Sequence, residues 1–279
     1  MEYTISDLIL STITVEAKIS NINFKEKELI ELLSLEDKSD IIKIGCNFNE
    51  YISDTYLELT KPVKKSNRGR KKKVKPLSNR KIQGNGKYFN SQITFTILDS
   101  IDKNKFYHLK LFTNGTIQIP YVCNENIEII KPIINSIIKK IENLKNIKVD
   151  SDENIEIVYI KSIMRNYKFN LIEPEIYIDL YKFQSILLDY KNEQNDLDIY
   201  KLYNLELSLI KFFPERYTGI ILKFKTPIPE NQNKLTTVKI FSSGKMNIDG
   251  SNSLNESNNI KEIILYLLKK NKETILYTK

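Results

Sequence analysis

Two phenylalanines stand on strand faces that are otherwise polar and basic. Alternate residues of a strand point to the same side. Phe112 therefore shares its side with Lys110, Asn114, Thr116 and Gln118, and Phe241 shares its side with Lys239, Ser243, Lys245, Asn247 and Asp249. Neither ring is needed for a core on that side, and lysines can neutralise a polyanion. The pattern predicts a binding face that combines exposed rings with positive charge.

Catalytic and metal-binding patterns are missing from the sequence. His108 is the single histidine, and the two cysteines, Cys46 and Cys123, cannot form a structural zinc site. The carboxylates are scattered, and the chain has neither a glycine-rich phosphate loop nor a nucleophile motif. We therefore predict a protein that is not an enzyme and that uses no cofactor or metal.

The charge balance favours a nucleic-acid partner. The formal net charge is +8 with a pI near 9.1, and such a charge attracts polyanions. An alternative is a soluble protein with a lysine-rich surface, because isoleucine, lysine and asparagine are abundant while Ala17 is the sole alanine, a bias that AT-rich codons explain.

A basic loop is predicted over residues 61–80. Its cations include Arg68, Arg70, Lys71, Lys72 and Lys73. These residues suit nonspecific DNA attraction or nuclear targeting. A solvated loop without a role is the alternative.

The sequence shows neither a membrane span nor a secretory signal. It has no run of ~18 apolar residues, and residues 1–18 lack the pattern of a signal peptide. The few cysteines fit a reducing compartment. We expect a cytosolic, nuclear or viral-factory location and no membrane partner.

A strand, hairpin and helix unit occurs twice. The hairpins span residues 110–119 and 239–248, with turns on Asn114-Gly115 and Ser243-Gly244. Further strands are predicted over residues 8–19, 89–97, 155–171 and 217–225. Helices are predicted over residues 24–35, 128–144, 176–190 and 254–270. Residues 40–60 are interpreted as an insertion with some strand, and residues 191–204 as a linker.

This order predicts an α+β fold of two pseudo-symmetric repeats, residues 1–150 and residues 151–279. Antiparallel strands would form one curved sheet with helices on the convex face. The expected core positions of the hairpins are Leu111, Ile117, Ile119, Val238, Ile240, Met246 and Ile248. The other face of the sheet would be left polar.

The chain resembles the TATA-box-binding protein family, whose core is a saddle of two such repeats. FPERYTGIILK at residues 213–223 and IFSSGK at residues 240–245 are similar to a strand and hairpin of the second repeat in that family. LSTITV at residues 10–15 is similar to its first strand. The resemblance covers most of residues 5–35, 86–144 and 155–270.

The resemblance implies DNA binding in the minor groove through the uncovered face of the sheet. In the family, two pairs of phenylalanines wedge between base steps and bend the duplex, and this family is a standard example of such kinking. By position, the pairs are Phe89 with Phe112 and Tyr217 with Phe241. The remaining implied DNA contacts are Lys110, Asn114, Thr116, Lys223, Lys239, Ser243, Lys245 and Asn247.

Several positions depart from the family pattern. Tyr217 replaces a wedge phenylalanine, and Leu8 and a residue near Ile160 replace two asparagines that read the groove. Pro120 and Asp249 replace threonines. We expect DNA bending without strict preference for TATA sequences.

The leading hypothesis is a transcription initiation factor that bends AT-rich double-stranded promoter DNA. Helices 128–144 and 254–270 would recruit a transcription factor IIB-like protein and RNA polymerase. We expect a monomer from a large DNA virus, located in the host nucleus or a cytoplasmic viral factory and packaged in the virion.

Two alternatives belong to other classes. The first is a saddle-fold protein-interaction subunit of a viral transcription complex that has lost specific TATA recognition. The second is the accessory domain of a nucleic-acid enzyme.

Overall fold

The computed structural model describes residues 3–20, 22, 24–33, 40–47, 50–60, 91–99, 102, 104–144, 154–173, 175–193, 202–225 and 234–278. These residues belong to two compact units. The N-terminal unit comprises Thr14–Val122 and Asn126–Ser162. The C-terminal unit comprises Met1–Ile13, Cys123–Glu125 and Ile163–Lys279. The predicted boundary between residues 150 and 151 lies outside the described residues.

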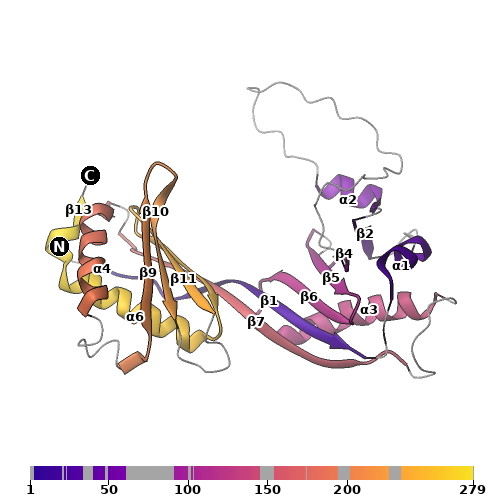
Figure 1. The fold of residues 1–279 in the computed structure, drawn as a ribbon. Helices are drawn as coiled ribbons and strands as arrows, with labels where there is room; N and C mark the ends of the chain where they lie inside the picture. Colours follow the sequence, from indigo (N-terminus) through magenta and orange to yellow (C-terminus); the bar gives the residue numbers. More distant parts are fainter. Residues whose placement is uncertain are drawn as a thin grey trace, which may run out of the picture. The chain divides into compact units, whose positions relative to one another are not determined.

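The first half of the chain contributes the elements from β1 to α3 (Figure 1). They are β1 (Ile9–Ile19), α1 (Glu26–Leu32), β2 (Ile41–Gly45), β3 (Glu50–Ile52), α2 (Asp54–Leu59), β4 (Gln92–Leu98), β5 (Phe106–Phe112), β6 (Thr116–Val122), the 3-10 helix η1 (Ile127–Ile130) and α3 (Lys131–Glu142).

The second half repeats much of this order. Its elements are β7 (Ile157–Asn170), β8 (Ile176–Ile178), α4 (Leu180–Glu193), β9 (Glu206–Phe213), β10 (Tyr217–Lys225), β11 (Leu235–Phe241), β12 (Lys245–Ser251), α6 (Leu254–Lys270), α7 (Lys272–Ile275) and β13 (Leu276–Thr278).

The strands follow the same order in both units. In the N-terminal unit the order is β3-β2-β4-β5-β6-β1, and in the C-terminal unit it is β9-β10-β11-β12-β7. β2, β4, β5 and β6 therefore correspond to β9, β10, β11 and β12, and these strands pair antiparallel. The predicted α+β class with antiparallel strands is confirmed.

The core of the C-terminal unit lies between its sheet and its helices. The predicted positions Val238, Ile240, Met246 and Ile248 are all fully buried. They form one cluster with side chains of α4 and α6, which lie beside these strands (Figure 1). The helical positions in this cluster are Leu180, Phe183, Leu187, Tyr190, Ile260, Ile263, Ile264, Leu267 and Leu268, with Ile275 of α7. One face of the sheet is therefore buried in the core.

The N-terminal unit uses the same alternation. Leu111, Ile117 and Ile119 are fully buried, as predicted. The helical residues buried in this unit are Leu29, Ile30, Ile134, Ile137, Ile138 and Ile141. α3 begins after η1 with a proline in its first turn, where the missing N–H costs little.

Several predicted boundaries were wrong. The helix predicted to begin at residue 176 begins at Leu180, because Asp179 accepts hydrogen bonds from the backbone N–H groups of Tyr181 and Lys182, both at 3.1 Å. Residues 176–178 instead form β8, which pairs with β13. β9 was not predicted as a strand. β4 begins at Gln92, because Ser91 has a φ of 71°.

A glycine closes each hairpin against the long strand beside it. The Gly115 carbonyl accepts from Ile19 N at 3.0 Å, and the Gly244 carbonyl accepts from Leu171 N at 3.1 Å. Both glycines have positive φ, 80° and 74°. A Cβ at Gly244 would lie 2.8 Å from three side-chain atoms of Leu171. These close approaches require glycine at equivalent places in the two units.

We predict that Gly244→Ala lowers the free energy of unfolding by about 2–4 kcal/mol, because it combines a strained backbone with a steric clash. Gly250→Ala is a matched control, since Gly250 also has positive φ (83°) but a Cβ there would come no closer than 3.9 Å to another atom. It should cost only about 1–2 kcal/mol. Urea unfolding followed by circular dichroism measures both. Equal losses would contradict the close approach.

Candidate nucleic-acid interface

The face of the C-terminal sheet opposite its core carries lysines on five strands. The register places Lys211 opposite Ile221, Ile221 opposite Lys239, Lys239 opposite Asn247, and Asn247 opposite Lys168. This row crosses the sheet from β9 to β7. The residues that alternate with this row along the strands point to the other face of the sheet and are the buried core positions. We call this side, with its lysines Lys168, Lys211, Lys223, Lys225, Lys239 and Lys245, the open face.

An aromatic group occupies one end of the open face. The rings of Tyr217 and Phe241, paired by prediction, have centroids 5.8 Å apart and an interplanar angle of 58°. Phe213 lies opposite Tyr217 in the register and is 57% exposed. The structure therefore brings together the two predicted rings and adds a third.

Gly219 determines how the Phe241 ring lies. It faces Phe241 across the β10–β11 ladder, and a Cβ at this position would be 3.1 Å from two ring carbons of Phe241. The ring therefore rests over the glycine and leans toward Tyr217. An aromatic ring that covers a strand glycine compensates for its missing side chain.

Sequence reasoning missed Phe213, Lys211 and Lys168. Residues 205–212 were not predicted as a strand, and Phe213 entered only through the family resemblance. In β9, Lys211 and Phe213 are exposed on either side of buried Phe212, and this short alternation was a usable signal. Lys168 lies between the buried rings of Tyr167 and Phe169, which already place it on the opposite face.

Asp249 is paired with Lys239. The Lys239 ammonium lies 2.7 Å from the Asp249 carboxylate, and about a third of each side chain is exposed. The hydrogen bond to Asp249 raises the pKa of Lys239 above its usual value. The carboxylate that Asp249 adds to this face is therefore paired with Lys239, one of the implied DNA contacts.

The polar residues of the hairpin turn are exposed. Ser243 and Lys245 lie at the surface, and Asn247 is half-buried. Lys245 faces Asn170 across the β12–β7 ladder. Lys223, in β10, is half-buried opposite Leu209 and Thr237. Each of these predicted contacts lies on the open face or at its hairpin turn.

The N-terminal unit places its predicted residues on the corresponding face. Lys110 lies opposite Thr94 and Gln118. Phe112 is half-buried and faces Gln92, where the other unit has Gly219 facing Phe241.

The turn of this hairpin holds two more predicted contacts. Asn114 is exposed, and its side-chain oxygen accepts from Thr116 N at 3.0 Å. Thr116 is half-buried. Phe89 and the basic residues Arg68, Arg70, Lys71, Lys72 and Lys73 lie outside the described residues.

Part of this second face is covered by α2. The Tyr56 ring lies 6.4 Å from that of Phe106, which contacts His108 edge-on at 5.3 Å. His108 Nδ1 is hydrogen-bonded to the Thr96 hydroxyl at 3.1 Å, and Thr96 is only 1% exposed. His108 is half-buried, and Tyr56 of α2 contacts Phe106 beside it.

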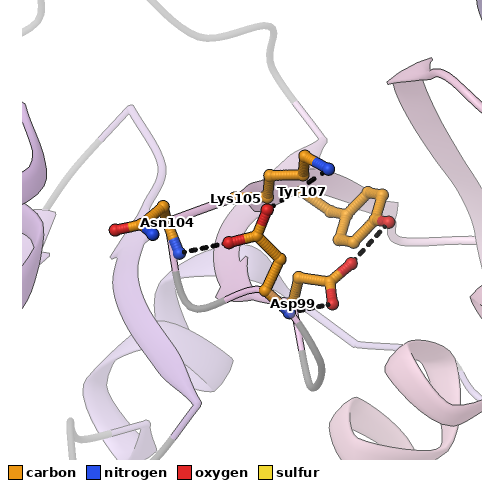
Figure 2. A network of polar contacts seen from close by, with 5 residues as sticks. Asp99, Asn104, Lys105 and Tyr107 are labelled. Carbon is orange, nitrogen blue, oxygen red and sulfur yellow. Dashed lines mark hydrogen bonds and ion pairs between the residues drawn. The ribbon is translucent and has the colours of Figure 1, made fainter.

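A compact polar turn joins β4 to β5 (Figure 2). Asp99 accepts from Asp102 N at 2.9 Å and from the Tyr107 hydroxyl at 2.8 Å. Asp102 accepts from Asn104 N at 3.1 Å and pairs with Lys105 at 3.2 Å. The hydrogen bond from Asn104 lowers the pKa of Asp102. These contacts satisfy the carboxylates within the turn and fix the hairpin that carries Lys110 and Phe112.

Other kinds of site are not found in the part of the chain that the structure describes. No group of three or more potential metal ligands occurs there. Among the described helices, none has the length and apolar character needed to cross a bilayer.

We predict that stability falls as the pH drops below about 6.5, the usual pKa of an unfolded histidine. Burial, followed by the charges of Lys43 and Lys110, lowers the pKa of His108 in the folded protein. The unfolded chain therefore takes up this proton first, and folding loses free energy until the folded pKa is reached.

His108→Gln should remove this component of the pH dependence of stability. It is measured by urea unfolding as the difference in free energy of unfolding between the unchanged protein and the variant at each pH. Because His108 is the only histidine, its NMR signal gives the folded pKa directly. A value at or above about 6.5 would contradict the prediction.

Comparison with known proteins gives one family match. Residues 181–271, which include the open face from β9 to β12, match the family model of transcription factor TFIID, or TATA-binding protein (TBP). A solved structure of Methanococcus jannaschii TBP is similar to the chain, with a TM-score of 0.45 and 16% identity over 95% of this chain and 99% of that one. A search of curated proteins found no match. These matches do not support a viral origin. The family match concerns residues 181–271, which are similar to the TBP family.

Proposed function

We propose that the chain is a TBP-like, DNA-binding transcription initiation factor. Its ligand would be the minor groove of double-stranded promoter DNA, bound by the open face of the C-terminal unit. The aromatic group would enter a base step and bend the duplex, while lysines at its sides neutralise phosphates.

The observation that carries this proposal is the aromatic group itself. Phe213 is exposed and Tyr217 and Phe241 are half-buried on a sheet face rich in lysine, and none of the three belongs to the core beneath, where the strands are packed against α4 and α6. An apolar ring flanked by cations fits a ligand with a stacked apolar interior and a charged rim. Double-stranded DNA has both.

Specific TATA recognition is not part of the proposal. The Tyr217 hydroxyl opposes deep insertion into a stack of bases, because it would lose its hydrogen bonds to water. The Lys239–Asp249 pair adds a carboxylate to the face. The minor groove of A·T pairs presents only hydrogen-bond acceptors, so this carboxylate would find no donor there. We therefore propose bending with an altered sequence preference.

Recruitment of a transcription factor IIB-like protein and RNA polymerase would use the helices, since the open face is assigned to DNA.

A second candidate function is a protein-interaction subunit. The contact between Tyr56 and Phe106 favours it, because α2 then covers part of this face of the N-terminal unit and keeps that part from contacting a groove. Failure to shift an AT-rich duplex in a gel, together with co-purification of polymerase, would favour this second function.

We predict that the triple variant Phe213→Ala, Tyr217→Ala, Phe241→Ala abolishes bending of an AT-rich duplex, measured by energy transfer between dyes at the duplex ends. Without rings, no side chain can hold a base step open. Tyr217→Phe should instead increase bending, because it removes the hydroxyl.

Tyr181→Ala is the matched control. Tyr181 is a 65% exposed aromatic on α4, packed edge-on against Phe212 on the helical side of the sheet. Its loss should leave bending unchanged. Unaltered energy transfer in the triple variant would show that the rings are not wedges.

We predict that Lys168, Lys211, Lys223 and Lys245 make phosphate contacts. Changing any one to Gln should reduce the slope of log affinity against log salt by about 0.9. Lys269→Gln, an exposed charge at the end of α6, should leave the slope unchanged. If all five variants shift the slope alike, the effect comes from net charge and not from this face.

A further inference from the structure

Asp249 is a carboxylate held within the open face. It follows Ile248, which is fully buried, and lies opposite Thr237 in β11. Its partner Lys239 is in the neighbouring row of the same face. A carboxylate there is costly for a surface that binds a polyanion, unless it has a ligand of its own.

The backbone around Asp249 is built to hold it in place. A β-bulge follows between Ile248 and Ser251, with Gly250 at a φ of 83°. Gly250 N donates to the Asn166 side-chain oxygen at 2.9 Å, and the Asn166 amide donates to the Thr12 hydroxyl at 2.9 Å. Bulges redirect side chains at functional positions. The carboxylate thus sits on a fixed strand and not on a mobile turn.

The minor groove offers one kind of donor to such a carboxylate. A·T pairs present only the acceptors N3 of adenine and O2 of thymine, whereas a G·C pair adds the 2-amino group of guanine. An ionised carboxylate only accepts. It is repelled by every A·T pair and satisfied by guanine.

Resting on the proposed function, we propose that Asp249 reads the 2-amino group of guanine in the minor groove, with Lys239 donating to an adjacent acceptor. The two side chains form an acceptor and a donor 2.7 Å apart. A G·C pair presents its amino donor beside the acceptors guanine N3 and cytosine O2, so the pair of side chains matches it. The preferred ligand is then an AT-rich site that contains a G·C pair.

The proposal predicts a dependence on one amino group. Affinity is measured by fluorescence anisotropy for AT-rich duplexes in which a single A·T pair is replaced, position by position, by G·C, by inosine·C or by 2,6-diaminopurine·T. Inosine lacks the 2-amino group, and diaminopurine adds it to an A·T pair. At one position, G·C and diaminopurine·T should bind about 10- to 150-fold tighter than inosine·C and A·T, which is the effect expected of a hydrogen bond to a charged group.

Variants of Asp249 and Glu206 distinguish recognition of the base from a general effect of negative charge. Asp249→Ala should bind the four pairs alike, and Asp249→Asn, which can also donate to A·T acceptors, should lose most of the preference. Glu206→Gln removes the same charge from the start of β9, opposite Lys225. It should strengthen binding to all duplexes and keep the preference for the amino group.

The outcomes distinguish this inference from the function on which it rests. No binding to any duplex would overturn the proposed DNA-binding function. Binding without dependence on the amino group, or a dependence that persists in both folded Asp249 variants, would overturn the reading of guanine and leave DNA binding intact. Circular dichroism confirms that each variant is folded.

Discussion

The strict alternation of the strands is the constraint on which the binding face depends. In the C-terminal unit, Val238, Ile240, Met246 and Ile248 must all face α6, and a slip of one residue would turn each of them to water. Gly244 adds a second restraint on the register, because it packs directly against the Leu171 side chain and leaves no room there for a Cβ. With the register fixed in this way, the positions of Phe241, Lys239 and Asn247 on the other face follow without further contacts.

The two units show how one scaffold can carry two different surfaces. Their strand order and turn glycines correspond, whereas the faces opposite their cores differ. Gln92 stands where Gly219 makes room for the Phe241 ring, and Tyr56 of α2 contacts Phe106 on this face of the N-terminal unit. The C-terminal unit therefore holds the more accessible candidate interface, and it is also the unit that contains the match to the TBP family.

Local patterns were sufficient to predict the hairpins, the core positions and the class of fold. Alternation and a turn glycine act over a few residues, so Leu111 and Ile240 could be assigned to the core from their neighbours alone. The Tyr217–Phe241 pair was also predicted, although through a family resemblance.

Features that depend on distant residues could not be predicted in this way. The contact of Phe106 with Tyr56 depends on an insertion whose path the sequence does not define. β8 is a strand because β13 pairs with it from the far end of the chain. The Lys239–Asp249 pair depends on a diagonal contact between strands, which requires the register and not only the alternation.

The partial exposure of the Lys239–Asp249 pair matters for any role in binding. A deeply buried pair would be costly to break, because each charge would be left without water or a partner. A pair exposed by about a third on both sides contributes only ~0–1 kcal/mol. It can therefore exchange its internal contact for contacts to a ligand at little cost, provided that the ligand supplies both a donor and an acceptor. A ligand that supplies acceptors alone satisfies Lys239 and leaves Asp249 desolvated, so discrimination between the two kinds of ligand arises from the carboxylate.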